Sequence, residues 1–267
     1  MKKKKILIYT LSMLIPVVIF FVAAWINGYV PFGKEMLNSY DSFSQYSGML
    51  LEYSRLLRGS NIFYSWGAGL GFNFFGTLTY YGMSPLNLFS MFASPHNYHM
   101  FFAIMTFVRF ALLGGSMCFY LSHKKIKPLY VVLFSTIYAL MGYTCTYYYN
   151  YIWIDSVIML PLVIHGLDKI LDGKSPLFYI ASLAFTIIIN YYIGYMICIF
   201  SLIWFIYNVV LKKDKKSIVK TFLISSLIAG LLGSVVILPS FFALMTGKAD
   251  LYSTVKYFGI SRNALTF

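Results

Sequence analysis

Residues 2–26 read KKKKILIYTLSMLIPVVIFFVAAWI, a cluster of lysines followed by a largely apolar segment. A helix needs roughly 20 apolar residues to cross the hydrocarbon core of a membrane, and residues 6–26 reach that length. The small residues at 22–24 would also suit cleavage of a signal peptide. Because the apolar run is longer than a signal peptide needs, the stretch predicts an uncleaved membrane anchor.

The composition of the whole chain extends this pattern. Of 267 residues, 60% are hydrophobic and 11% are charged, whereas soluble domains carry about 25% charged residues. The formal net charge is +13, but most of the positive charge stands in short runs between apolar segments. That distribution is typical of membrane topology rather than of a nucleic-acid-binding patch. We therefore expect a polytopic membrane protein that binds no nucleic acid.

Further apolar segments of spanning length lie at about 97–121, 129–148, 152–171, 176–191, 193–211 and 219–243. They predict an all-α polytopic membrane protein with about seven transmembrane helices, in a single transmembrane domain over residues 1–267. One set of helix ends carries most of the 21 basic residues: Lys2, Lys3, Lys4, Lys5, Lys124, Lys125, Lys127, Lys169, Lys174, Lys212, Lys213, Lys215, Lys216 and Lys220. The positive-inside rule then places the N-terminus in the cytoplasm.

Two segments are expected on the outer side of the membrane. Residues 27–96 form a large loop between the first and second spans, and residues 247–267 form an outer C-terminal segment. The chain ends there with no closing helix and no basic stop. We therefore expect it to be the N-terminal portion of a longer protein.

The large outer loop contains a predicted amphipathic helix over residues 41–58. Its apolar positions recur at helical spacing: Phe43, Tyr46, Leu50, Tyr53 and Leu57. Its polar positions do the same: Asp41, Gln45, Gly48, Glu52 and Arg55. Glu52 and Arg55 can pair at i,i+3, and a helix with two such faces is expected to lie in the membrane interface. Residues 85–92, capped by Ser84, predict a second short interfacial helix.

Asp41 stands in the first turn of the predicted helix and is one of only 8 acidic residues in the chain. An Asp at this position commonly caps a helix by accepting hydrogen bonds from free backbone N–H groups. A first-turn carboxylate at a membrane surface can also accept a proton or bind a divalent metal. The two roles are compatible, and both stay open at this point.

Charged residues at membrane depth are costly and are functional candidates. Arg109 lies near the middle of the second predicted span, where it can bind a lipid phosphate or pair with a carboxylate or carbonyls inside the protein. Asp155 lies one turn into the fourth predicted span, on the outer side. It can share a site with Asp41 or cap its own helix.

Histidines and aromatic residues supply weaker candidates. His96 and His99 stand at i,i+3 before the second span, but nothing fixes a third metal ligand. The Asn-Tyr-Tyr sequence at 190–192 must turn the chain between the fifth and sixth spans, and Tyr195 follows it. Such tyrosines are typical of the aromatic belt at a membrane interface, although aromatic rings also stack on sugars.

Several short motifs follow one another in a distinctive order. They are Asp-Ser-Phe-Ser-Gln-Tyr at 41–46, Tyr-Ser-Trp at 64–66, Tyr-Tyr at 80–81, Ser-Pro-Leu-Asn at 84–87, Trp-Ile-Asp at 153–155 and Asn-Tyr-Tyr at 190–192. No single motif is decisive. Their order resembles the YfhO family of bacterial membrane proteins, and the resemblance covers nearly the whole chain.

The resemblance implies a fold and an activity. The family is similar to membrane glycosyltransferases of the C-type fold, which take a sugar from a polyprenyl-phosphate carrier on the outer membrane face. In that fold the first outer loop carries an acidic residue essential to catalysis, and Asp41 occupies that place here. YfhO-like proteins are linked to sugar decoration of teichoic acids in Gram-positive bacteria. Members of the family are longer and have more spans than this chain.

The resemblance, added to the reading of these residues, implies a glycosyltransferase in the cell membrane of a bacterium. The expected catalytic residues are Asp41 and Asp155. The expected residues for binding substrate and lipid phosphate are Arg109, Arg55, Arg58, Gln45, Asn190, Tyr191, Tyr192 and Tyr195. The expected partners are a polyprenyl-phosphate-linked sugar, a cell-surface glycopolymer acceptor and membrane lipid, and a divalent metal at Asp41 is an open alternative. The rival functions are a transporter or flippase, with Arg109 and Asp155 as an intramembrane relay, and a non-catalytic scaffold.

Overall fold

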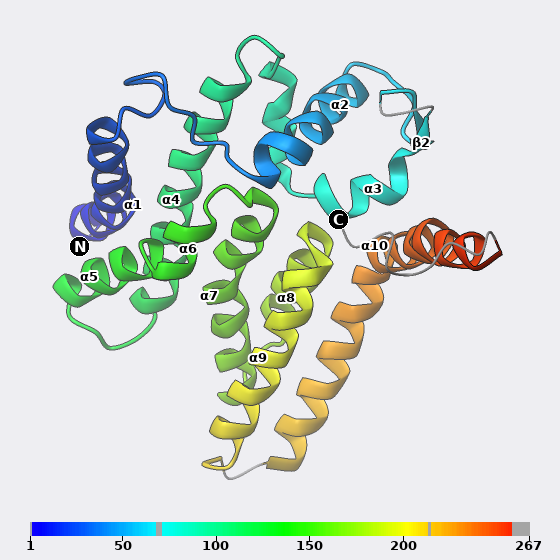
Figure 1. Cartoon of the computed structure of the whole chain (residues 1–267). Coiled ribbons are helices and arrows are strands. Elements are labelled where there is room, and N and C mark those ends of the chain that lie inside the picture. Colours follow the sequence, from blue (N-terminus) through cyan, green and yellow to red (C-terminus); the bar gives the residue numbers. More distant parts are fainter. Residues whose placement is uncertain (1, 68–70, 213–214, 258–267) are drawn as a thin grey trace.

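The computed structural model describes residues 2–67, 71–212 and 215–257, and it is almost wholly helical (Figure 1). In chain order the elements are α1 (Lys2–Ile26), the π-helix η1 (Ser42–Tyr46), α2 (Ser47–Leu57), β1 (Tyr64–Ser65), β2 (Phe72–Asn73), α3 (Phe74–Tyr81), the 3₁₀ helix η2 (Pro85–Phe92), α4 (Tyr98–Ser122), α5 (Pro128–Ala139), α6 (Gly142–Tyr147), α7 (Tyr151–Leu171), α8 (Leu177–Ile189), α9 (Tyr191–Val209) and α10 (Lys215–Tyr257). β1 and β2 pair as a short antiparallel hairpin. The predicted all-α architecture is confirmed.

Within the described residues, 5 helical segments are long and apolar enough to cross a membrane: Lys3–Ile26, Tyr98–Ser122, Pro128–Tyr147, Tyr191–Val209 and Lys215–Ala243. Each overlaps one of the predicted spans, so the polytopic prediction is confirmed. The other two predicted spans are helical but do not qualify. α8 has 13 residues and reaches only about 20 Å. α7 has 21 residues, many of them buried, and is not among the five segments.

Local sequence signals explain where several helices begin and end. The predicted span at 129–148 is divided at Leu140 and Met141, between α5 and α6. Asn190 ends α8 and begins α9, because its backbone is extended and its side-chain Oδ1 accepts from the N–H of Ile193 at 3.0 Å. The predicted turn between the fifth and sixth spans is therefore made by a single capping residue.

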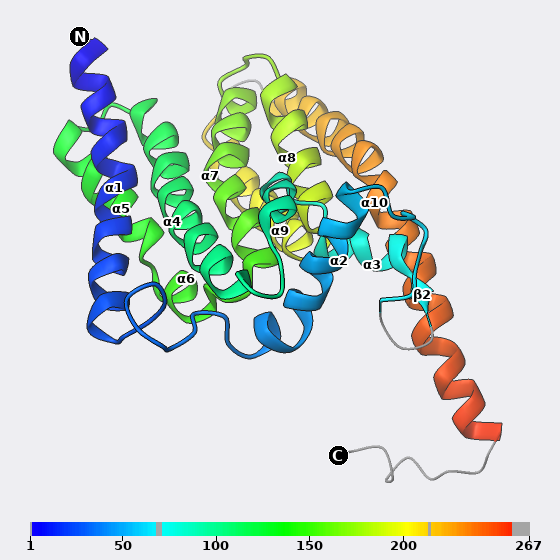
Figure 2. The ribbon, with the colours of Figure 1, turned by 90° about the horizontal axis from the view of Figure 1, so that it is seen from above.

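Helix α7 lies at the centre of the bundle and packs against α4, α8 and α9. α1 and α5 pack on α4 at one side, and α10 packs on α8 at the other (Figure 2). The largest group of buried apolar residues runs along α7 and α8 and includes Leu167, Ile170, Tyr179 and Leu183. The elements η1, α2, α3 and η2 of the outer loop gather at one end of this bundle (Figure 1).

Helix α10 extends beyond the last predicted span. It contains Pro239 and continues to Tyr257, and its C-terminal part runs in a different direction from its first part in Figure 1. A proline inside a helix removes a backbone hydrogen bond and bends the helix. The predicted outer segment 247–267 therefore begins inside α10, and residues 258–267 lie outside the described part of the chain.

The crossing of α7 and α8 depends on the absence of a side chain at Gly166. A Cβ added there would lie 2.6 Å from the Cα and 2.7 Å from the backbone nitrogen of Tyr179. Because a neighbouring backbone cannot move aside cheaply, we expect Gly166→Ala to lower the free energy of unfolding by about 1–3 kcal/mol. Unfolding in detergent micelles, followed by circular dichroism, measures this loss.

Gly230→Ala in α10 is the matched control for this substitution. A Cβ at Gly230 meets nothing within 4 Å, so the higher helix propensity of alanine predicts no loss of stability there. Equal destabilisation by the two substitutions would contradict the argument from close packing at Gly166.

The outer loop packs onto the bundle through the predicted amphipathic helix. η1 and α2 together cover residues 42–57, close to the predicted 41–58. Tyr46 and Leu50, from the predicted apolar face, are buried in a cluster with residues of α4 and α7. Phe43, from the same face, is 58% exposed. The central part of this face therefore contacts protein. The predicted contact of this part with the membrane is wrong.

The second predicted interfacial helix is present as η2. Ser84 caps it as predicted, because its Oγ accepts from the N–H of Leu86 at 3.3 Å. Four of its apolar side chains are at least 50% exposed: Leu88, Phe89, Met91 and Phe92. An exposed apolar stretch of this kind suits the plane of a membrane interface.

Candidate functional site

Asp41 lies at the start of η1 but does not cap it. Its backbone is already helical, with φ −62° and ψ −29°, and its carboxylate accepts no hydrogen bond from the backbone of η1. A capping residue normally has an extended backbone. The helical turn has already begun at Tyr40, whose carbonyl oxygen accepts from the N–H groups of Phe43 and Ser44. The capping interpretation of Asp41 is therefore wrong, and its carboxylate can serve other partners.

The carboxylate of Asp41 accepts a hydrogen bond from a side chain instead. Gln45 Nε2 donates to Asp41 Oδ1 at 3.1 Å. The hydroxyl of Tyr81 donates to Gln45 Oε1, also at 3.1 Å. Asp41 is half-buried and Gln45 is exposed. The three side chains form a polar chain from η1 to the end of α3, in which the carboxylate is held in place but remains open to solvent.

The π-helical turn of η1 shapes this arrangement. The N–H of Ser47 donates to the carbonyl oxygen of Ser42, five residues earlier, which makes the turn wider than that of an α-helix. In this turn Asp41 and Gln45 meet on the open side, while Tyr46 is 3% exposed. Single π-helical turns are rare in proteins, and those that occur often lie at functional sites.

Tyrosine rings gather near the polar chain. We define the tyrosine cluster as Tyr40, Tyr46, Tyr80, Tyr81, Tyr149 and Tyr191. The ring centroids are 5.6 Å apart for Tyr46–Tyr81, 4.8 Å for Tyr80–Tyr81, 5.5 Å for Tyr80–Tyr191 and 5.2 Å for Tyr40–Tyr149. The members come from the outer loop, from the turn before α7 and from the start of α9. Each ring offers a flat apolar face together with a hydroxyl.

The hydroxyls of this cluster act as hydrogen-bond donors. Burial raises the pKa of Tyr46 well above its ordinary value, and the negative charge of Asp41 raises it further. Burial, and after it the neighbouring Tyr80 and Asp41, raises the pKa of Tyr81 in the same direction. Both hydroxyls therefore stay protonated at physiological pH. The Tyr46 hydroxyl donates to Oδ1 of Asn150 at 2.8 Å.

The hydrogen bond from Tyr46 to Asn150 fastens η1 to the start of α7. Because Asn150 is 2% exposed, its oxygen cannot find water when the donor is removed. We expect Tyr46→Phe to lower the free energy of unfolding by about 1–3 kcal/mol, measured by unfolding in detergent micelles. Tyr53→Phe is the control, since the hydroxyl of half-buried Tyr53 makes no hydrogen bond within the described chain. A loss no larger than the control's would show that this bond contributes little stability.

Arg109 and Asp155 form an ion pair inside the bundle. Arg109 Nε lies 2.6 Å from Asp155 Oδ1, and Nη2 lies 3.2 Å from Oδ2. The two side chains are 5% and 2% exposed, and the guanidinium lies 5.0 Å from the ring centre of Tyr151. Two roles are predicted for Arg109, binding of a lipid phosphate and pairing inside the protein. The structure shows the pairing inside the protein. Asp155 does not cap α7, whose capping position is Asn150.

The two predicted catalytic carboxylates lie in different surroundings. Within the described residues, no hydrogen bond or ion pair joins Asp155 to Asp41. The ring of Tyr46 packs edge-on against Tyr151, with centroids 5.3 Å apart, and Tyr151 packs in turn against the guanidinium of Arg109. Asp41 thus belongs to an open polar site, and Asp155 belongs to a closed ion pair inside the bundle.

The arginines of α2 have local partners. Arg55 pairs with Glu52 at 2.9 Å, as predicted. Arg58 donates to the carbonyl oxygen of Met91 in η2 at 2.9 Å. Both arginines are exposed, and neither bonds to Asp41 within the described chain. Their role in binding phosphate stays a prediction.

The residues at the turn between α8 and α9 are divided between two places. Asn190 is fully buried, and its Nδ2 donates to the carbonyl oxygen of Tyr80 at 3.3 Å. Tyr191 packs on the ring of Tyr80 and so belongs to the tyrosine cluster. Tyr192 packs instead against Trp153, with ring centroids 6.0 Å apart. Of the predicted sugar-binding residues here, the structure brings Asn190 and Tyr191 into the site.

The remaining candidates lie apart from the tyrosine cluster. Tyr195 is 67% exposed on α9. His99 Nδ1 lies 2.9 Å from Oδ1 of Asn38, and His96 is exposed. In the part of the chain that the structure describes, no three His, Cys, Asp or Glu side chains come together in a way that could hold a metal ion.

Sequence reasoning missed two residues that complete the site. Tyr81 bonds to Gln45 from a position 36 residues away, and Asn150 bonds to Tyr46 from a position 104 residues away. These contacts are tertiary, so no local spacing signals them. In the sequence, only the Tyr-Tyr motif at 80–81 points to Tyr81 as a site residue, and no motif points to Asn150.

Comparisons with known proteins identify relatives of the chain. A family model described as "Bacterial membrane protein YfhO" matches residues 12–267. Among curated proteins, the chain is similar to "Uncharacterized protein YfhO" of Bacillus subtilis (strain 168), with 23% identity over 282 residues, 95% of this chain and 31% of the relative. The chain therefore spans about a third of the length of this curated relative. No solved structure matches the chain.

Proposed function

The chain belongs to the YfhO family of bacterial membrane proteins, and from that premise we propose that it transfers a sugar from a polyprenyl-phosphate carrier to a cell-surface polymer such as teichoic acid. The observation that carries the proposal is the carboxylate of Asp41, which is half-buried, bonded by Gln45 and not used as a helix cap. The tyrosine cluster beside it supplies aromatic faces that suit a sugar, among them the ring of Tyr40, which is 76% exposed.

Asp41 acts as the general base in the proposed reaction. Its carboxylate takes the proton of an acceptor hydroxyl, and the hydroxyl oxygen forms a bond to the anomeric carbon of the sugar. The bond between that carbon and the phosphate oxygen breaks, and its electron pair leaves with polyprenyl phosphate. The proton then passes from Asp41 to water. Gln45 and Tyr81 are positioning residues, because they hold the carboxylate through the polar chain.

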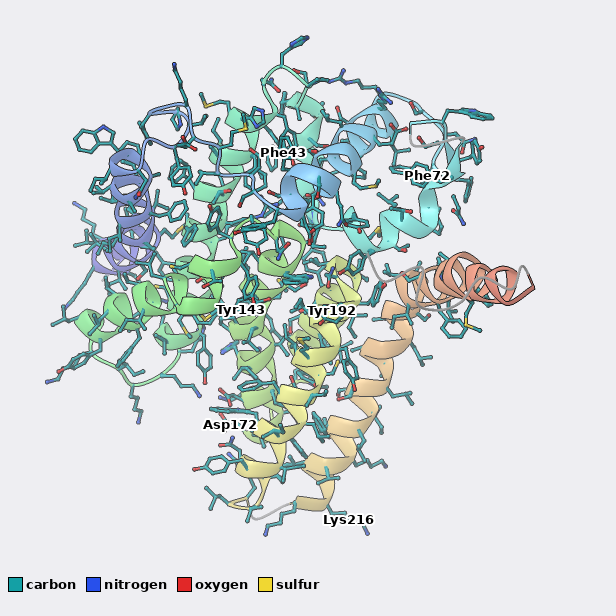
Figure 3. All side chains as sticks on the ribbon, viewed as in Figure 1. Phe43, Phe72, Tyr143, Asp172, Tyr192 and Lys216 are labelled. Carbon is teal, nitrogen blue, oxygen red and sulfur yellow. The ribbon has the colours of Figure 1, made fainter. Side chains whose placement is uncertain are left out.

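The proposed site lies on the outer face of a Gram-positive cell membrane, with the N-terminus in the cytoplasm. A separation of charge along the bundle supports this orientation. Lys212 bonds to Asp172 at 3.1 Å in the lysine-rich region of the α7–α8 and α9–α10 turns. Figure 3 shows Asp172 and Lys216 at the end of the bundle opposite to Phe43 and Phe72. Short basic turns favour the cytoplasmic side, which leaves Asp41 outside.

The rival function, transport of a lipid-linked sugar, has less support. It needs Arg109 and Asp155 as an intramembrane relay, whereas the two bind each other in a closed pair. It also gives no role to the open carboxylate of Asp41. A non-catalytic scaffold leaves the same carboxylate unexplained.

The test of the proposed function uses a strain that lacks the complete gene. We expect its surface polymer to lose the sugar and its membrane to accumulate the sugar-loaded carrier, both measured by mass spectrometry. The carrier should collect in the outer leaflet, where periodate, which does not cross the membrane, oxidises the sugar in intact protoplasts. A carrier that is protected from periodate would support the flippase instead. Unchanged decoration without accumulation would exclude both functions.

A further inference from the structure

A pocket with several polar side chains lies on the outer loop, between the C-terminal half of α2 and the segment 60–67. Its volume is about 460 Å³, and its lining includes Glu52, Arg55, Asn61, Tyr64, Ser65 and Trp66. A pocket of this size is within the range of small-molecule sites. None of the lining residues belongs to the polar chain of Asp41 or to the tyrosine cluster.

The pocket is built around the carboxylate of Glu52. This side chain is 13% exposed, and it accepts hydrogen bonds from Arg55 at 2.9 Å and from the hydroxyl of Ser65. Ser65 Oγ in turn accepts from the N–H of Gly67 at 2.9 Å. A Cβ at Gly67 would meet the carboxylate of Glu52, so a side chain there would displace this carboxylate from its present position. The contacts hold the segment that carries Trp66 against α2.

The groups open to a ligand are an aromatic face and N–H donors. Trp66 is 78% exposed, and its ring is held edge-on by Tyr64, with centroids 5.0 Å apart. The Asn61 amide oxygen accepts from the backbone of Phe63 at 2.7 Å, while its amide nitrogen donates to no group in the described chain. Arg55 is 64% exposed and uses one of its N–H groups for Glu52. The formal charges of Glu52 and Arg55 balance, but the carboxylate is 13% exposed and the guanidinium side chain is 64% exposed, so the positive group is the one that a ligand meets.

We infer that this pocket binds an anionic saccharide unit. The sugar ring stacks on the exposed face of Trp66, and an acidic or phosphate group of the same unit meets the guanidinium of Arg55. The amide of Asn61 donates to a ring hydroxyl. An exposed aromatic ring beside fixed polar donors is the arrangement that places a flat, hydroxylated ligand.

The pocket lies on the same helical stretch as the candidate active site. Glu52 follows Asp41 by eleven residues, which corresponds to roughly 16 Å along a helix. An extended polymer that presents one hydroxyl to Asp41 can therefore occupy the pocket with a neighbouring unit. The assignment of the saccharide to the acceptor polymer rests on the proposed function, whereas binding in the pocket does not.

Membrane anchoring is the other role open to an exposed tryptophan. The surroundings of Trp66 favour the saccharide, because Glu52, Arg55 and Asn61 place charged and polar groups in the same pocket. Exposed apolar side chains that suit a membrane stand on η2, in residues 88–92, and also at Ile62 and Phe63 outside the pocket. Phe63, which is 66% exposed on the same segment but does not line the pocket, separates the two roles experimentally.

The test uses the protein from its complete gene in lipid nanodiscs and measures binding by isothermal titration calorimetry. The probe is a set of teichoic acid oligomers released from the bacterial cell wall, compared with the phosphate-free units that hydrofluoric acid releases when it cleaves their phosphodiesters. We expect the intact oligomers to bind, Trp66→Ala to weaken them about tenfold or more and Phe63→Ala to leave them unchanged. Arg55→Met should remove the preference for the intact oligomers.

The outcomes separate this inference from the proposed function. Normal oligomer binding by a protein that transfers no sugar would contradict the proposed function but would still support the saccharide-binding pocket. In an active protein, Trp66→Ala should raise KM for the polymer and leave kcat unchanged. Absence of binding by the wild type, or equal binding by wild type and Trp66→Ala, overturns the inference. Equal losses in Trp66→Ala and Phe63→Ala would assign Trp66 to the membrane and overturn the inference as well.

Discussion

Asp41→Asn is expected to lower the rate of sugar transfer by about 100- to 10,000-fold, the usual contribution of a general base. The substitution keeps the size of the side chain, and the amide oxygen of asparagine can still accept from Gln45. It cannot accept a proton from the acceptor hydroxyl. The polar chain through Gln45 and Tyr81 is therefore expected to survive while the chemistry fails. Single-turnover transfer from a loaded carrier, with the protein from its complete gene in nanodiscs, measures the rate.

Glu35→Gln is the matched control for this substitution. Glu35 is another outer-loop carboxylate; it is exposed and makes no side-chain bond within the described chain, so its loss should leave the rate unchanged. The unfolding transition of Asp41→Asn should lie close to that of the wild type, as for a surface substitution. Transfer by Asp41→Asn at the wild-type rate would reduce Asp41 to a structural residue. Equal losses in both variants would point to a general effect of charge on the outer loop.

Several elements of this fold are readable from the sequence because their signals are local. The start of η2 was predicted from Ser84, whose hydroxyl bonds a backbone group two residues away. The turn at Asn190 was predicted from a polar residue between two apolar runs, and the same residue caps α9. The helix over residues 41–58 was predicted from its periodic faces. In each case the deciding contacts lie within a few positions of the chain.

The predictions failed where a distant partner decides the structure. The sequence assigns the apolar face of η1 and α2 to the membrane, because a periodic pattern cannot distinguish lipid from protein as the apolar partner. Tyr46 is in fact buried against α4 and α7. The choice between lipid phosphate and an internal partner for Arg109 stayed open because Asp155 lies 46 positions away. The cap at Asp41 failed because the turn begins one residue earlier, at Tyr40.

Removing one member of the Arg109–Asp155 pair is expected to lower the free energy of unfolding by about 3–5 kcal/mol, because the other charge is left buried without a partner. Both Arg109→Met and Asp155→Leu should show this loss. The side chains are 5% and 2% exposed, and α4 is one of the segments apolar enough to span a membrane, so water cannot replace the missing partner cheaply. Unfolding in detergent micelles, followed by circular dichroism, measures each variant.

The double variant decides whether the pair acts through mutual neutralisation. Arg109→Met with Asp155→Leu removes both charges, so its loss should be smaller than the sum of the single losses and can fall near zero. Lys124→Met is the control: its pair with Asp168 is half-exposed, at 39% and 16%, and should contribute less than about 1 kcal/mol. Additive losses in the double variant would mean that the two side chains do not interact as a pair. Single variants that are stable but inactive would instead support the rival function with an intramembrane relay. A relay needs both charged side chains, whereas a structural pair needs only that the two charges balance.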